Sequence, residues 1–243
     1  MPLSGKSVLV TGAARRLGAA MVRAFHGAGA NVAIHYRSSG DEAEALCDVL
    51  NGLRPNSAMT VALDLNDSDA LPRLPRAVHN RFGSLDGLVN NASSFFPTPV
   101  GDITQENWDD LVGSNLKAPV FLTQAAAPLL TESSGFVINM VDIHASRPLK
   151  DHPVYCAAKA GLHMFTRSMA RELGPAVRVN GIAPGPVLWP ETDMSDDDKA
   201  DIVQDTALQR CGDESDIVQA AMYLATAGFV TGQIIAVDGG RSV

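Results

Sequence analysis

The stretch VINMVDIHASRPLKDHPVYCAAKAGLHMFTRSMAREL, residues 137–173, is the part of the chain around which the rest is organised. It predicts a buried strand, a connecting loop and a long helix that a following Gly-Pro pair brings to an end. Tyr155 and Lys159 are four residues apart, so a phenol and an ammonium stand on one face of this helix. A cation there favours the phenolate, and Asp142, thirteen residues before the tyrosine, can face the same space. An ordinary amphipathic helix would show the same pair, so the rest of the chain has to decide.

The composition is that of one soluble globular domain. With 243 residues, 46% of them hydrophobic and 19% charged, the chain suits a single α/β domain with a sizeable core. Its net charge of −8 argues against a general binder of nucleic acid or of anionic membranes. Three scattered cysteines, with no signal peptide and no long apolar run, predict a cytoplasmic protein. We expect no metal site.

Strand-like and helix-like segments alternate along the whole chain. The expected strands are residues 7–11, 31–36, 57–63, 85–89, 136–141, 176–183 and 234–237. The alternation predicts one α/β domain, residues 1–243, with a Rossmann-type doubly wound parallel sheet of about seven strands flanked by helices. Residues 186–210 combine proline, acidic residues and a short helical pattern, so we expect them to form a lid over the substrate.

The ends of the first three strands indicate a dinucleotide site. Strand 7–11 runs through TGAARRLG into a helix, whose N-terminal N–H groups can bind a phosphate. The second strand is not followed by the carboxylate that binds a ribose 2′-hydroxyl, and Arg15, Arg37 and Ser38 instead offer what a 2′-phosphate requires. Asp64, after the third strand, can accept a hydrogen bond from an adenine amino group. We therefore expect NADPH, with a solvated basic edge as the alternative.

The segment NNASSFFP, residues 90–97, leaves the carboxyl end of the fourth strand. Open α/β sheets bind their ligands at this edge, so the adjacent Phe95 and Phe96 suggest a stacking wall for a flat ligand. Packing of at least one of the two rings against the loop is the alternative.

Several short motifs occur in the order and spacing of the short-chain dehydrogenase/reductase family, which the chain resembles over nearly its whole length. They are Thr11-Gly12, Asp64, Asn90-Asn91-Ala92, Asn115, Tyr155 with Lys159, and Pro184-Gly185. The resemblance implies a nicotinamide cofactor at the strand ends and Tyr155 as the proton donor. It also implies that Lys159 binds the nicotinamide ribose and lowers the tyrosine pKa, and that Asn115 holds a proton-relay water.

Oligomeric state is a further expectation. Relatives in this family pair the helices that correspond to those bearing Asn115 and Tyr155, so the resemblance implies a homotetramer. Both helices carry broad apolar faces, formed by Phe121, Leu122 and Ala125 and by Leu162, Phe165 and Met169. The alternative is that these faces only cover the sheet of their own subunit.

Two departures from the family pattern carry information about the substrate. Arg16 stands where the middle glycine of the usual TGxxxGxG motif belongs, and Asp142 replaces the usual serine. A carboxylate would repel the oxyanion that forms when a ketone is reduced. A ring C=N bond fits better, because its nitrogen must be protonated and neighbouring N–H groups can donate to the carboxylate.

The same departures occur in the pteridine reductases of this family, which the chain resembles at TGAARRLG, HYRSS, NNASSFFPTP and NMVDIHASRPL. The resemblance implies NADPH-dependent reduction of a dihydropterin, with oxidised pterin or dihydrofolate as further candidates. Phe95 would stack on the pterin, Ser93 and Arg16 would bridge pterin and cofactor phosphate, and Asp142 with Tyr155 would form the acid end. The residues expected to bind the cofactor are Gly12, Arg15, Arg16, Leu17, Tyr36, Arg37, Ser38, Asp64, Leu65, Asn91, Ala92, Ser93, Lys159, Pro184, Gly185 and Val187.

Two other functions stay open at this point. One is a reductase of the same family that acts on a 3-oxoacyl thioester or a simple ketone, which Asp142 argues against. The other is a dinucleotide-binding regulator without turnover, which the complete set Asn115, Tyr155 and Lys159 argues against.

Overall fold

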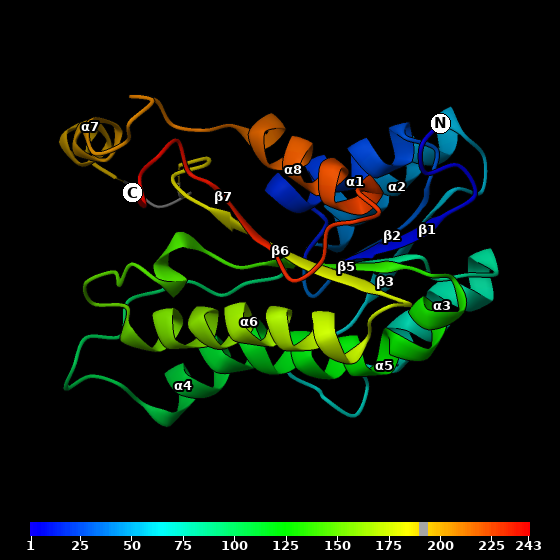
Figure 1. Cartoon of the computed structure of the whole chain (residues 1–243), viewed down its shortest axis with the longest axis horizontal. Coiled ribbons are helices and arrows are strands. Elements are labelled where there is room, and N and C mark those ends of the chain that lie inside the picture. The colour runs from blue at the N-terminus through cyan, green and yellow to red at the C-terminus, as the bar shows by residue number, and fades with distance from the viewer. Residues whose placement is uncertain (190–193) are drawn as a thin grey trace.

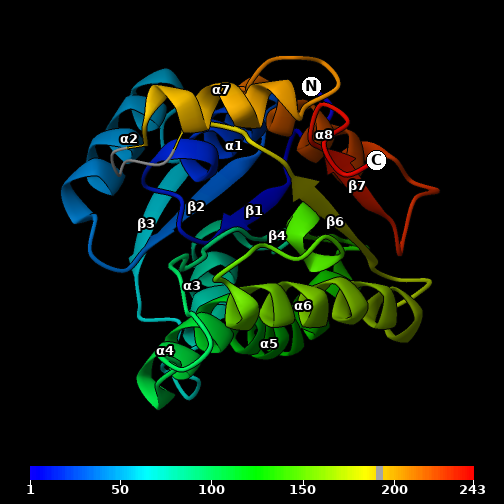
Figure 2. The same cartoon turned by 90° about the vertical axis from the view of Figure 1, so that its left-hand side faces the viewer.

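The computed structural model describes residues 1–189 and 194–243. Within these ranges seven strands form one parallel sheet in the order β3-β2-β1-β4-β5-β6-β7 (Figures 1 and 2). The strands are β1 (Ser7–Val10), β2 (Asn31–Tyr36), β3 (Ala58–Ala62), β4 (Gly87–Asn90), β5 (Phe136–Met140), β6 (Arg178–Pro184) and β7 (Ile234–Val237). This confirms the predicted single-domain, doubly wound fold.

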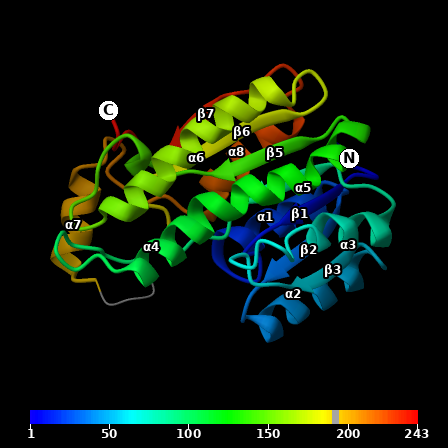
Figure 3. The ribbon, with the colours of Figure 1, turned by 90° about the horizontal axis from the view of Figure 1, so that it is seen from below.

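Helices cover both faces of the sheet (Figures 1 and 3). One face carries α1, α2 and α8, and the other carries α3, α5 and α6, with α4 at the end of that layer. The helices are α1 (Arg16–Gly27), α2 (Gly40–Leu53), α3 (Arg73–Phe82), α4 (Gln105–Val112), the π-helical turn η1 (Gly113–Lys117), α5 (Ala118–Glu132), the short 3₁₀ turn η2 (Ile143–Ala145), α6 (Pro153–Glu172), α7 (Asp196–Gln204) and α8 (Glu214–Thr226).

The two-sided core explains why the strands are apolar along their whole length. In β1, Val8 and Val10 pack in the cluster under α1 and α8, whereas Leu9 points to the opposite cluster under α3 and α5. Successive side chains of a strand face opposite sides, so a strand covered by helices on both sides needs apolar residues at every position.

The chain reverses its winding direction between β1 and β4, which are neighbours in the sheet although two strands separate them in sequence. In an open α/β sheet a crevice forms at such a reversal, outside the carboxyl ends of the strands. This edge faces the viewer in Figure 2, with α7 lying beside it. The fold therefore directs the search for a site to the loops that leave β1, β4 and β5.

Three details refine the sequence-based expectations. The predicted helical region from Thr104 to about Leu130 is divided by the π-helical turn η1, whose backbone hydrogen bonds join residues five apart instead of four. Leu122 and Leu162 pack inside the subunit, whereas Phe121 keeps 41% of its surface exposed, so only part of each apolar face remains for a partner. The expected lid contains α7, and its residues 190–193 lie outside the described part of the chain.

No helix in the described ranges combines the length and the apolar character needed to cross a membrane.

Candidate active site

A cavity of about 410 Å³ runs along the carboxyl ends of β1, β2, β3 and β4. Its lining brings together most of the residues expected to bind the cofactor, namely Gly12, Arg15, Arg16, Leu17, Tyr36, Arg37, Ser38, Asp64, Leu65, Asn91, Ala92 and Ser93. Lys159 Nζ lies 5.6 Å from the centre of the Tyr155 ring, while Val187 lines a second cavity of about 400 Å³ beside β7. Four expected cofactor residues lie outside the lining of the first cavity: Lys159 on α6, Pro184 at the end of β6, and Gly185 and Val187 after it.

The glycine turn after β1 is held against the end of β4 by short contacts. Gly12 has a φ of 59°, and a Cβ atom at this position would lie 2.9 Å from the Cα of Ala92. The Thr11 hydroxyl accepts hydrogen bonds from the N–H groups of Asn91 and Ala92, at 2.9 and 3.0 Å. Glycine is therefore required here both for the left-handed backbone and for the close approach of two loops.

Arg16 occupies the position of the missing glycine and keeps the backbone conformation that a glycine adopts easily. Its φ is 51°, which costs an ordinary L-residue about 1 kcal/mol. The guanidinium donates a hydrogen bond to the carbonyl oxygen of Trp189, over a distance of 3.1 Å. A cationic side chain from the first turn of α1 thus reaches the segment that leaves β6.

The acid group expected from the sequence is assembled in the structure. The Tyr155 hydroxyl donates a hydrogen bond to Oδ2 of Asp142 at 2.7 Å. The other oxygen of Asp142 accepts the N–H of His144 at 2.8 Å and so caps η2. Lys159 is 2% exposed, donates from Nζ to the carbonyl oxygen of Met140 at 2.8 Å, and lies 5.6 Å from the centre of the tyrosine ring.

The pKa values of Tyr155 and Lys159 both depart from the usual values of these side chains. Burial, and then the Asp142 carboxylate, raise the pKa of Tyr155 well above its usual value. Desolvation and a like charge both disfavour the phenolate, so they set the net direction of the Tyr155 pKa shift. Burial lowers the pKa of Lys159 to about 8, and Asp142 opposes part of this effect. The structure thus holds Tyr155 as a protonated phenol, the form that a proton donor needs.

Asn115 lies in η1 and connects the loop after β4 to the helix below it. Its Oδ1 accepts the hydroxyl of Ser93 at 2.6 Å, and its Nδ2 donates to the carbonyl oxygens of Ser94 and Leu111 at 2.8 and 3.0 Å. π-helical turns are often found at functional sites because they turn a side chain out of the regular helix pattern. Here the turn places an amide that fixes the loop bearing Ser93 and Phe95.

The two adjacent phenylalanines have different surroundings. Phe95 is 55% exposed, stacks on His152 with ring centres 4.7 Å apart, and meets the Tyr155 ring edge-on at 4.9 Å. Phe96 packs with Leu111 and Tyr155 in a small apolar cluster. Phe96 is therefore a packing residue, whereas the ring of Phe95 remains exposed beside Tyr155.

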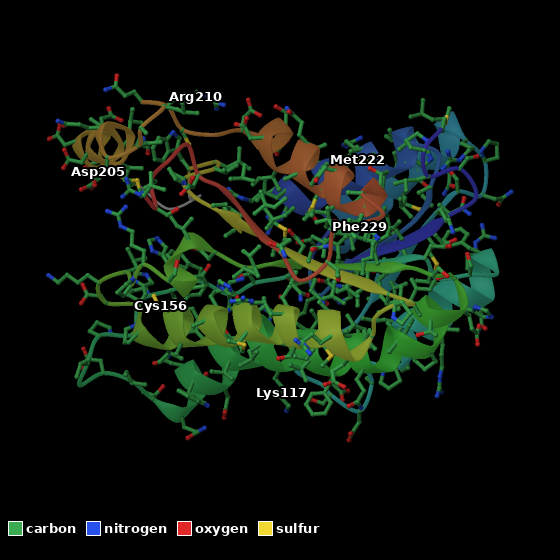
Figure 4. All side chains as sticks on the ribbon, viewed as in Figure 1. Lys117, Cys156, Asp205, Arg210, Met222 and Phe229 are labelled. Carbon is green, nitrogen blue, oxygen red and sulfur yellow. The ribbon has the colours of Figure 1, made fainter. Side chains whose placement is uncertain are left out.

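Cys156 follows the tyrosine at the start of α6 (Figure 4). Its sulfur accepts the N–H of Leu149 at 3.4 Å, and its side chain packs against the same cluster as Phe96. This environment is that of a small packing residue.

His35, on β2, is a site residue that the sequence reasoning missed. It is 1% exposed, lines the cavity of about 410 Å³, and bonds to the glycine turn and to the residue that follows β3. The available signal was a lone polar residue within the apolar run NVAIHY, which does not by itself reveal the partners.

Comparisons with known proteins agree with this geometry. A family model described as enoyl-(acyl carrier protein) reductase matches residues 12–242. Pteridine reductase 1 of Leishmania tarentolae is 36% identical over 279 residues, which cover 97% of this chain and 96% of that protein. A 3-oxoacyl-acyl-carrier-protein reductase of Staphylococcus aureus is 34% identical over 240 residues, with 97% of both chains covered. Among solved structures, a mutant short-chain dehydrogenase/reductase of Serratia marcescens matches with a TM-score of 0.93 at 32% identity, with both chains fully covered.

The chain belongs to the short-chain dehydrogenase/reductase family, and it is an oxidoreductase of the kind that uses a nicotinamide dinucleotide. The cavity suits such a cofactor, because its lining offers glycine-turn backbone and arginines for phosphates and Asp64 for the adenine. Identity to the pteridine reductase and to the 3-oxoacyl reductase is nearly equal. The choice of substrate therefore has to be argued from the residues of the site.

Proposed function

We propose that the protein is an NADPH-dependent reductase that converts a dihydropterin to a tetrahydropterin by reducing a ring C=N bond. The observation that carries the proposal is the 2.7 Å hydrogen bond from the Tyr155 hydroxyl to Asp142. A carboxylate beside the proton donor suits a substrate with N–H groups and opposes one that develops an oxyanion. The similarity to a pteridine reductase supports the same assignment.

The cofactor, when bound, supplies a hydride to the ring carbon and is oxidised to NADP⁺. The proton for the ring nitrogen comes from Tyr155, whose raised pKa keeps the phenol protonated until the nitrogen becomes basic. Asp142 holds the hydroxyl in place and can accept an amino or ring N–H of the substrate. The C=N bond thereby becomes a CH–NH bond, and hydride and proton are both accounted for.

The flat substrate would lie against Phe95, whose ring is exposed and held beside the tyrosine by its edge-on contact. Stacking on an aromatic face orients a bicyclic ring without using its hydrogen-bonding edge. Ser93 is linked to Asn115 and lines the cofactor cavity, so it stands where cofactor and pterin would meet. Oxidised pterin and dihydrofolate carry the same ring and are further candidate substrates.

A reductase of 3-oxoacyl thioesters is the second candidate, because the 3-oxoacyl-acyl-carrier-protein reductase of Staphylococcus aureus is 34% identical over 97% of its length. Asn115, Tyr155 and Lys159 serve either reaction. Asp142 favours the pterin, since its charge would lie next to the oxyanion of a reduced ketone.

Asp142→Ser tests the proposal, because it removes the carboxylate charge beside the Tyr155 hydroxyl. We expect dihydropterin reduction to fall by about a hundredfold, the scale of a positioned acid–base group, while activity on a small activated ketone holds or rises. The measurements are NADPH oxidation with each substrate and the melting temperature. If the residue only caps η2, the variant loses melting temperature and both activities fall equally. Intact pterin turnover would favour the ketone reductase instead.

We also propose that the segment 186–210 closes over the substrate, with residues 190–193 outside the described ranges. The hydrogen bond from Arg16 to Trp189 supports this, because it joins the start of that segment to the cofactor cavity.

A further inference from the structure

The imidazole of His35 lies between two rims of the cofactor cavity. The backbone N–H of Gly12 donates to Nδ1 at 3.1 Å, and Nε2 lies 3.1 Å from the carbonyl oxygen of Leu63. The carbonyl oxygen of His35 accepts the N–H of Ala13 at 2.8 Å. One residue of β2 therefore connects the glycine turn after β1 to the last residue before Asp64.

These partners determine the form of the ring. A backbone N–H can only donate, so Nδ1 has to carry the lone pair; a carbonyl oxygen can only accept, so Nε2 has to carry the proton. Both conditions are met by the neutral tautomer that carries its proton on Nε2. The cationic imidazolium cannot meet them, because its Nδ1 also carries a proton. Burial favours the same form, since it lowers the pKa of His35 to about 4.

The arrangement also removes two N–H groups from phosphate binding. The amides of Gly12 and Ala13 both point to His35, so the turn uses them to fix its own shape. The spacing between this turn and Asp64 is then set by the width of an imidazole ring. A dinucleotide places its phosphates on one rim and its adenine on the other, so this spacing has to match the cofactor.

We infer that His35 is a positioning residue for the dinucleotide, acting through Gly12 and through the carbonyl oxygen of Leu63. Loss of the ring should weaken cofactor binding while leaving the proton transfer of Tyr155 unaffected. The inference rests on the nicotinamide cofactor of the proposed reductase and not on the pterin, so failure of the pterin assignment would leave it intact.

Three variants separate the hydrogen bond to Gly12 from the hydrogen bond to Leu63. His35→Asn keeps an acceptor near the position of Nδ1 and loses the link to Leu63, whereas His35→Gln keeps a donor toward Leu63. His35→Phe keeps an aromatic ring and loses both hydrogen bonds. The matched control is His26→Phe. His26 is also buried, at 5% exposure, and bonds through Nε2 to the Ser57 hydroxyl at 2.7 Å, in the last turn of α1 and away from the cavity.

The dissociation constant of NADPH, measured by the change in its fluorescence on binding, is the main readout. We expect His35→Phe to raise it by about tenfold or more, because a buried N–H is left without an acceptor, and His35→Asn to raise it less. The turnover number at saturating cofactor should stay within about twofold of the parent value, so the loss appears in KM. His26→Phe should lower the melting temperature without changing the dissociation constant.

A purely structural histidine gives another result. His35→Phe and His26→Phe would then lose melting temperature alike, and the dissociation constant of NADPH would not change. If His35→Phe does not fold, His35→Asn and His35→Gln provide the test, and parental dissociation constants in both would overturn the inference. Activity with a ketone and none with a pterin, together with weakened NADPH binding, would reject the substrate assignment and support the role of His35.

Discussion

Two regions at the carboxyl ends of the strands are built in different ways. We call the cavity between Gly12 and Asp64 the cofactor end, and the group of Asp142, Tyr155 and Lys159 the catalytic end. The cofactor end depends on backbone and small residues, as at Gly12, where a Cβ atom would lie 2.9 Å from Ala92. The catalytic end depends on buried ionisable side chains, with Tyr155 4% and Lys159 2% exposed. The first type of construction suits a cofactor that many relatives share, and the second can change its chemistry by one side chain. Relatives named as a pteridine reductase and as a 3-oxoacyl reductase can therefore be nearly equally similar to this chain.

The largest expected effect concerns Lys159, because burial lowers its pKa to about 8. Above this pH the ammonium that would hold the nicotinamide ribose loses its charge. We expect the catalytic efficiency to fall by about tenfold per pH unit between pH 8 and about 10. The fall is measured as initial rates of NADPH oxidation at limiting substrate.

Stability should move in the opposite direction over the same interval. The unfolded chain keeps the usual lysine pKa near 10.4 and binds more protons than the folded chain, so the contribution of Lys159 to the free energy of unfolding rises with pH. The full difference corresponds to about 3 kcal/mol, from the shift of 10.5 to about 8. Lys159→Met lacks the titrating group and should not show this rise in urea unfolding. An activity profile that is flat to pH 10 would show that the charge of Lys159 is not needed.

The sequence predicts the positions of some site residues better than those of others. The alternation of strands and helices predicts the sheet, and the spacing of Asp142 and Tyr155 predicts their contact, since a strand end and a helix face fix both positions. The contacts of His35 were not predictable, because its partners lie just after the ends of two other strands, which only the fold brings together. The net upward shift of the Tyr155 pKa was not anticipated from the sequence, because burial depends on packing and not on the nearest charge.

Cofactor choice is the next largest effect and tests the cofactor end alone. The expected tenfold or greater preference for NADPH over NADH corresponds to about 1.4 kcal/mol. Arg37 lines the cavity and is exposed, so Arg37→Ala should reduce this ratio with little change in NADH efficiency. Arg76→Ala, at an exposed position on α3, is the control for loss of a surface charge. Equal efficiencies with the two cofactors in the parent enzyme would refute the preference.

Changing the subunit contacts should have the smallest effect on cofactor affinity and turnover. Phe121 on α5 and Met164 on α6 remain 41% and 60% exposed, and both helices lie on the same face of the sheet. We predict a homotetramer that uses these side chains, since exposed apolar side chains are stabilised by burial against a second copy. The double variant Phe121→Glu, Met164→Glu should give a smaller assembly in multi-angle light scattering, because it would place four charges in a two-fold contact. Cofactor affinity and turnover should change by less than about twofold, because both ends of the site are formed within one subunit.

A parent protein that is monomeric at micromolar concentration would contradict the tetramer, and a large loss of turnover on dissociation would show that a second subunit completes the site.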